Sequence, residues 1–115
     1  MARYTCSFTI AVPSERLRLL LDDLLEACGL NIIYDQADYI MAREIPGAVF
    51  FTKLVTVVLM IQRSTASDSE FKMNLEMKNA ELPLNNDNHC NQMFHLVKQA
   101  IEENRHWQLL ESIVD

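Results

Sequence analysis

The sequence predicts an α+β domain of two layers, with an antiparallel sheet and two helices packed on one of its faces. Three observations lead to this class. Several segments carry apolar residues at every second position, which predicts strands, and two carry them at three-four spacing, which predicts helices. The consecutive strand segments are joined by connections too short for a parallel crossover. The expected order is strand, helix, four strands, helix.

Length and composition indicate one domain over residues 1–115, since the chain is half apolar and of ordinary domain size. Two glycines and three prolines leave no segment with the composition of a linker. The net charge of −6 disfavours a nucleic-acid partner, because binding to phosphates depends on clustered Lys and Arg. The first residues alternate instead of forming a signal peptide, so we expect a cytoplasmic location.

The first strand is expected over residues 4–12, where polar and apolar side chains alternate up to Pro13. A helix over residues 14–28 follows, because its leucines recur on one stripe. Ser14 is the predicted N-cap of this helix. Gly29 is predicted to be the left-handed residue at its C-terminal end.

Four strands are expected next. Residues 31–34 and 39–43 read as a hairpin, with turn residues between them. Residues 50–62 form the most apolar run, and we predict a central strand whose middle is covered on both faces. Residues 70–79 show the most regular alternation in the chain, with Lys72, Glu76 and Lys78 on the outward side.

The last helix is expected to begin after the predicted N-cap candidates at residues 85–88. Its apolar stripe includes Cys90, Phe94, Val97 and Ile101. Trp107, Leu110 and Ile113 resume that spacing. We therefore expect the helix either to continue to about Ser112 or to bend near Asn104.

The element order, the leucine-rich first helix ending at Gly29 and the segment from Asn31 to Met41 resemble the C-terminal kinase-associated domain. This domain belongs to the TATA-binding-protein-like and helix-grip group of folds. The resemblance implies binding either of anionic lipid head groups or of a partner protein domain. The family's basic, glycine-containing segment near the last helix corresponds here to residues 84–91, which are neutral to acidic. This disfavours an anionic-membrane module, which is a third hypothesis for the function.

No catalytic constellation is evident in the sequence, and we expect neither an enzyme nor a cofactor. His89, Cys90 and His95 form the one His/Cys cluster, but their spacing does not suit zinc and His89 diverges from Cys90 on a helix. Three cysteines without paired spacing read as small core residues. Asp22-Asp23 and Glu102-Glu103 diverge by about 100° on a helix, so we read them as solvated.

Two features suggest binding to another protein. The charged outward row at residues 70–79 either protects an edge strand or pairs with another chain. The C-terminal segment carries Trp107 and Leu110, which serve either a partner or the protein's own core. In addition, helices on one face of the sheet would leave the other side of the central strand without a cover. The candidate interface residues are Leu54, Val58, Met60, Lys72, Lys78, Trp107 and Leu110.

From these features we predict a small, non-enzymatic protein-interaction module, with self-association as one form of the interaction. The alternative is a helix-grip-type domain that binds a small molecule or a lipid in a pocket between the last helix and the sheet. Inward Phe, Tyr and Met side chains motivate this alternative.

Overall fold

The computed structural model describes residues 1–47, 49–65, 67–82, 84 and 87–114. Its strands are β1 (Ala2–Ala11), β2 (Leu30–Gln36), β3 (Tyr39–Glu44), β4 (Thr56–Arg63), β5 (Glu70–Asn79) and β6 (Gln108–Val114). Its helices are α1 (Ser14–Ala27), α2 (His89–Glu102) and the short 3-10 helix η1 (Phe51–Lys53).

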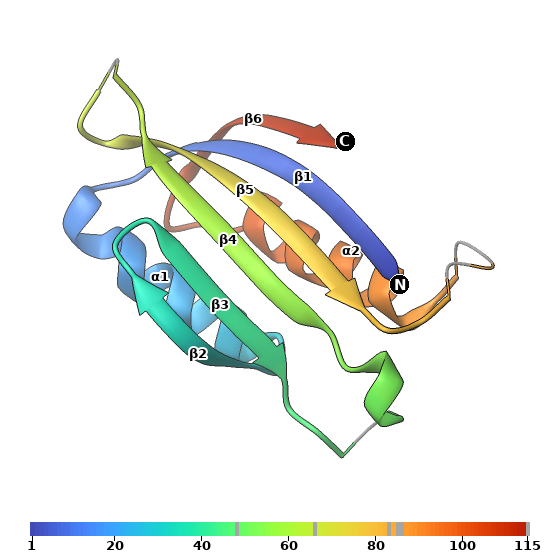
Figure 1. Cartoon of the computed structure of the whole chain (residues 1–115). Helices are drawn as coiled ribbons and strands as arrows, with labels where there is room; N and C mark the ends of the chain where they lie inside the picture. Colours follow the sequence, from blue (N-terminus) through green and yellow to red (C-terminus); the bar gives the residue numbers. More distant parts are fainter. Residues whose placement is uncertain (48, 66, 83, 85–86, 115) are drawn as a thin grey trace.

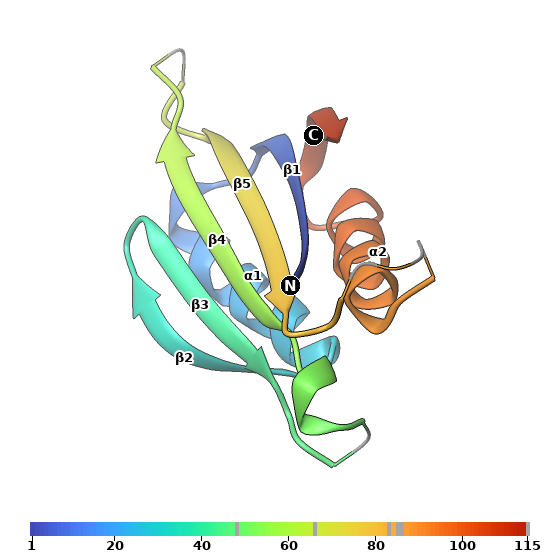
Figure 2. The same ribbon diagram turned by 45° about the vertical axis from the view of Figure 1, so that its right-hand side comes forward.

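Within the described residues the strands form one antiparallel sheet in the order β2-β3-β4-β5-β1-β6 (Figure 1). Helices α1 and α2 both lie on the same face of this sheet, behind its strands in Figure 1, and Figure 2 shows α2 beside β1. The predicted α+β class is therefore confirmed, and so is the placement of the helices.

The core lies between the helices and the sheet. Alternate residues of the four inner strands point into it, and so does the apolar stripe of each helix, because period-two and period-3.6 patterns each collect their apolar side chains on one side. The largest fully buried side chains are Phe8, Ile10, Leu21, Leu25, Leu30, Ile40, Leu59, Met73, Leu75, Met77, Ile101 and Val55.

Two of the three predicted helix caps are confirmed. Gly29 follows α1 with a φ of 81°, a conformation that glycine adopts without a side-chain penalty. Asn88 is the N-cap of α2, and its side-chain oxygen accepts from the Asn91 N–H at 2.8 Å. The other predicted caps Asn85 and Asn86 lie outside the described residues. Ser14 is not the cap of α1, because Pro13 holds that position without a side-chain hydrogen bond.

The predicted central strand is shorter than expected. Phe51 lies in η1, and β4 begins only at Thr56, so Leu54 is outside the strand. Coverage on both faces was also wrong: Val57, Leu59 and Ile61 are buried against the helices, whereas Met60 on the opposite side is 55 % exposed. The reason is that both helices lie on one face of the sheet.

Of the two alternatives for the last helix, continuation to Ser112 was wrong, and near Asn104 the chain turns without resuming the helix. Helix α2 ends at Glu102, and Asn104 accepts the backbone N–H of His106 in the turn that follows. The Trp107 indole then donates to the Ile101 carbonyl at 3.0 Å, which anchors the returning chain. Residues 108–114 pair with β1 as an edge strand instead of forming helical turns.

Candidate functional site

The face of the sheet opposite the helices, called the open face below, is the candidate site. Cross-strand register aligns its side chains in rows. One row runs Arg43, Thr56, Lys78, Arg3; the next runs Tyr34, Met41, Val58, Glu76, Thr5; a third runs Tyr39, Met60, Asn74, Ser7, Ile113. Because strands lie about 4.8 Å apart, neighbours in a row are in reach of the same ligand.

The open face has an apolar patch on strands β2 to β4. Its members are Tyr34, Tyr39, Met41, Val58 and Met60. Tyr34 is 56 % exposed, and its ring meets that of Tyr39 edge to face at 6.3 Å. The centre of the face is polar by contrast, with a 2.7 Å hydrogen bond from the Ser7 hydroxyl to Asn74 Oδ1.

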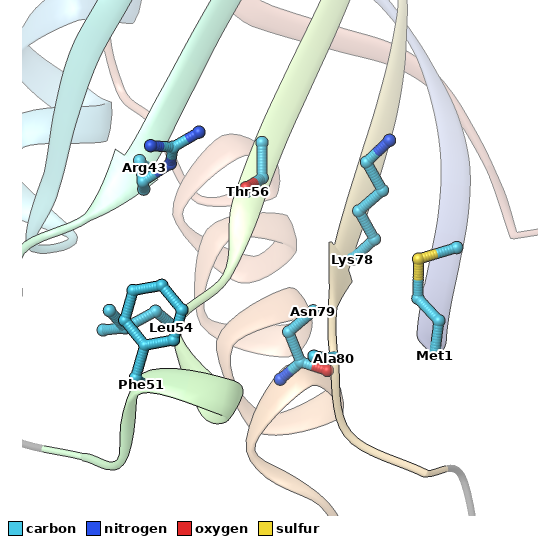
Figure 3. Close-up of a pocket in the computed structure, with 8 residues that line it drawn as sticks. All are labelled: Met1, Arg43, Phe51, Leu54, Thr56, Lys78, Asn79 and Ala80. Carbon is cyan, nitrogen blue, oxygen red and sulfur yellow. The ribbon is translucent and has the colours of Figure 1, made fainter.

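A hollow of about 560 Å³ lies at one end of the open face, where β4 meets η1. Its lining residues are Met1, Arg43, Phe51, Leu54, Thr56, Lys78, Asn79 and Ala80. Figure 3 shows the Phe51 ring beside Leu54, with Arg43 and Lys78 on either side of Thr56. The hollow thus combines cationic side chains with apolar ones. A second hollow of about 250 Å³ lies further along the face, beside Val58, Met60 and Asn74.

Positive charge prevails around the larger hollow. Arg3 pairs with the Glu76 carboxylate at 3.0 Å, and Lys78 lies 3.8 Å from the same carboxylate. Arg43 forms no ion pair with any residue in the described part of the chain. Glu76 therefore offsets the charges of Arg3 and Lys78, while the described residues provide no carboxylate partner for Arg43.

The structure gathers four of the predicted interface residues on the open face and a fifth at its hollow. Val58, Met60, Lys72 and Lys78 project from β4 and β5 on this side, and Leu54 lines the hollow. The other two lie elsewhere. Trp107 is only 7 % exposed and packs into the core, whereas Leu110 is 44 % exposed at the bulge of the edge strand β6.

Sequence reasoning missed Arg43 and Phe51. Arg43 occupies a strand position with two apolar residues, Tyr39 and Met41, on the same side, which was the available signal for its facing the open side. For Phe51 there was no comparable signal. The sequence predicts it to lie within the strand over residues 50–62, whereas β4 begins five residues after it.

The pocket that the alternative function needs would lie between α2 and the sheet. The residues of α2 that face the sheet are tightly packed there: Cys90, Phe94, Val97 and Ile101 are each at most 2 % exposed. A groove of about 480 Å³ lies instead between the two helices, lined in part by Leu20, Leu96 and His106.

The thiols and histidines do not assemble into a metal site in the described part of the chain. Burial, together with the charge of Glu81, raises the pKa of the Cys90 thiol to about 12, so this thiol is unreactive at neutral pH. His89 contacts the Glu44 carboxylate at 2.8 Å and not Cys90. The sequence did not predict this contact, because the two residues are far apart in the chain.

A carboxyl pair lies on the helix side, where Asp22 of α1 meets Asp35 of β2. The Arg18 guanidinium donates hydrogen bonds to the Asp35 carboxylate and to the backbone carbonyl of Gln36. Partial burial and the neighbouring Asp35 raise the pKa of Asp22 to about 6, even though Arg18 opposes the shift. Adjacent Asp22 and Asp23 were expected to be solvated, but Asp22 Oδ1 is buried without a hydrogen-bond partner.

Comparison of the sequence with protein-family models and with curated proteins found no match. Among solved structures, the chain is similar to DR_A0006 from Deinococcus radiodurans, with a TM-score of 0.53 and 10 % sequence identity, over 87 % of this chain and 92 % of that one. This similarity shows the fold alone. The resemblance to the kinase-associated domain stays a prediction. No helix among the described residues is long and apolar enough to cross a membrane.

Proposed function

We propose that the protein is a non-enzymatic interaction module that binds another protein chain through the open face of its sheet. The observation that carries this proposal is the one-sided placement of the helices, which leaves the apolar patch around Met41, Val58 and Met60 without a cover. Contiguous apolar surface of this kind, rimmed by polar groups, is typical of interaction sites.

The charge of the open face favours an acidic partner over a second copy of the chain. Its strands present four cations, Arg3, Arg43, Lys72 and Lys78, against the carboxylates of Glu70, Glu76 and Glu111. The chain as a whole has a net charge of −6. Salt largely screens interactions between exposed charges that are more than about 10 Å apart. A partner that contacts the open face is therefore affected mainly by the local excess of cations and less by the net charge of the whole chain. An acidic partner neutralises this excess, whereas a second copy doubles it.

The test compares two variants that add the same charge at matched apolar positions. Met60→Glu changes the open face, and Leu96→Glu changes the helix face, where Leu96 is 48 % exposed. Each variant and the unchanged chain are cross-linked in lysate, and the captured proteins are quantified by mass spectrometry. A captured partner is then purified and its affinity measured by calorimetry.

The proposal predicts a partner that Met60→Glu loses and Leu96→Glu retains, with at least tenfold weaker binding for Met60→Glu. Hydrogen exchange of the purified complex should show protection on β3 and β4. Light scattering reports whether a second copy is that partner. A strict monomer at high concentration, combined with no partner that depends on Met60, would overturn the proposal.

A further inference from the structure

The hollow at the end of the open face differs from the rest of that face, because it places cations and apolar groups around one small space. Arg43 and Lys78 are cross-strand neighbours of Thr56 on its two sides. Directly adjoining them, the Phe51 side chain is 86 % exposed and Leu54 is partly exposed. The hollow therefore has a cationic part and an apolar part that adjoin each other (Figure 3).

The cations around the hollow carry an electrostatic cost that an anion would relieve. Arg3 and Lys78 are directly opposite each other on β1 and β5, an arrangement that is unfavourable for like charges. Glu76 offsets part of this repulsion through its contacts with both. An anion placed over the Thr56 hydroxyl would lie between the guanidinium of Arg43 and the ammonium of Lys78, both of which donate hydrogen bonds to carboxylates.

We propose that this hollow receives the C-terminal residue of the partner chain, with its carboxylate over Thr56 and an apolar side chain against Phe51 and Leu54. The proposal rests on the proposed function and names the part of the partner that the open face recognises. Capture of a C-terminal carboxylate is one of the ways in which folded domains bind peptides.

A C-terminal residue fits better than an internal acidic one. In a C-terminal Leu or Phe, the carboxylate and the apolar side chain are attached to the same Cα atom. The hollow likewise presents cationic and apolar side chains around one space of about 560 Å³. An internal Asp or Glu would satisfy Arg43 and Lys78 but leave Phe51 in water.

The surface beyond the hollow favours a peptide over a simple alkyl anion. Two further register rows, at Val58 and Met60, extend about 13 Å from Thr56, the length of four extended residues. These rows place apolar Val58 and Met60 beside polar Glu76 and Asn74, with Thr5 and Ser7 one strand further on. A peptide can contact both the apolar and the polar residues, because it has side chains and a polar main chain. An alkyl chain can contact only the apolar ones favourably.

The test is an NMR titration of the ¹⁵N-labelled full chain with a pool of acetylated tetrapeptides that end in leucine. One pool has a free carboxylate and a matched pool has a C-terminal amide. Octanoate and inorganic phosphate form two further arms. We expect the free-acid pool to shift the amides of Arg43, Thr56 and Lys78, and the amide pool to bind at least fivefold more weakly.

Matched variants locate the anion. Lys78→Gln should weaken binding of the free-acid pool at least fivefold, whereas Lys72→Gln, on the same strand and face but six residues away, should leave it unchanged. Arg43→Gln and Phe51→Ser should each weaken it as well. The side chains of Arg43 and Phe51 are exposed, so we expect these variants to fold. The dispersion of their NMR spectra checks this.

Equal binding of acid and amide pools, no binding of the acid pool, or no effect of Lys78→Gln would overturn the assignment. So would octanoate or phosphate binding as tightly as the peptides, because the site would then take a small anion. These outcomes are distinct from failure of the proposed function: the assignment is wrong on its own if Met60→Glu still loses a partner. If peptides bind as expected but no partner depends on Met60, only the function of the wider face is wrong.

Discussion

His89 Nε2 at the start of α2 lies 2.8 Å and 3.0 Å from the two carboxylate oxygens of Glu44 at the end of β3. Glu44 is buried, and its Oε1 also accepts the backbone N–H of Val55 at 3.2 Å. The carboxylate thereby joins three segments: β3, the residue that precedes β4, and the first turn of α2. A buried acceptor of this kind stabilises the fold only while its donors are present.

We predict that His89→Ala lowers the free energy of unfolding by about 1–3 kcal/mol, because it leaves the buried Glu44 carboxylate with a single donor. His89→Gln retains an N–H donor and should recover part of this loss. Urea denaturation measures both. His95→Ala, at an exposed position of the same helix, is the control. Equal losses for His89→Ala and His95→Ala would contradict the prediction.

The raised pKa of Asp22 predicts how the stability of the protein depends on pH. The folded state holds the pKa of Asp22 at about 6, above its ordinary 3.8. The folded state therefore binds a proton that the unfolded state has released between about pH 4 and pH 6. Asp22 consequently favours folding at low pH, and this contribution is lost as the pH rises through 6.

Asp22→Asn should therefore make the protein more stable at pH 7.5 and flatten its stability between pH 4 and pH 7. We expect a gain of about 1 kcal/mol at pH 7.5, smaller than the pKa shift alone implies because solvent screens a partly exposed group. Thermal unfolding at several pH values measures the effect. Asp23→Asn, an exposed neighbour, is the matched control. A loss of stability at pH 7.5 would refute this account.

Glu81 acts at the start of α2 as a carboxylate cap. Partial burial raises its pKa, but hydrogen bonds from Asn79 and from the backbone N–H groups of Cys90 and His89 outweigh this and hold it below its usual value. These N–H groups have no partner within the helix, and the helix dipole favours an anion there.

We predict that Glu81→Gln lowers stability at pH 7 by about 0.5–1 kcal/mol. Because the pKa of the folded state is depressed, the stabilising effect of Glu81 is present above the ordinary pKa of a glutamate and is lost as the pH falls through the folded value. The difference between the variant and the unchanged chain should accordingly shrink on acidification. Glu103→Gln, past the other end of α2, serves as the control, and an undiminished difference in acid would exclude the cap.

Trp107 holds the edge strand β6 against the core through its indole contact with Ile101. We predict that Trp107→Ala lowers the free energy of unfolding by about 3–5 kcal/mol. Hydrogen exchange of the β6 amides should rise more than that of β4. Leu110→Ala, at the bulge of the same strand, should change neither by much. Unchanged exchange in β6 would mean that pairing with β1 alone holds the strand.

The periodicity of apolar residues in the first 79 residues predicted most of the fold, because in most of these segments the local pattern agrees with the element that the segment forms. Strands β1 and β5 alternate cleanly, and α1 carries its leucines on one stripe. For the segment from Trp107 to Val114 the local pattern was ambiguous. Apolar residues at positions 107, 110 and 113 fit a helix, while pairing with the open edge of β1 and the bond from Trp107 to Ile101 favour a strand.

By itself, then, the sequence determined the α+β class and the presence of apolar residues beyond what one covered face requires. Apart from residues 50–55, it also determined the segments that become helices and strands up to α2. The tertiary structure alone decided the strand order, the sixth strand and the meeting of Arg43, Thr56 and Lys78 beside Phe51. The physical reason is range: periodicity records which side of an element a residue faces, whereas neighbours across strands depend on register, which is set by packing among segments distant in the chain.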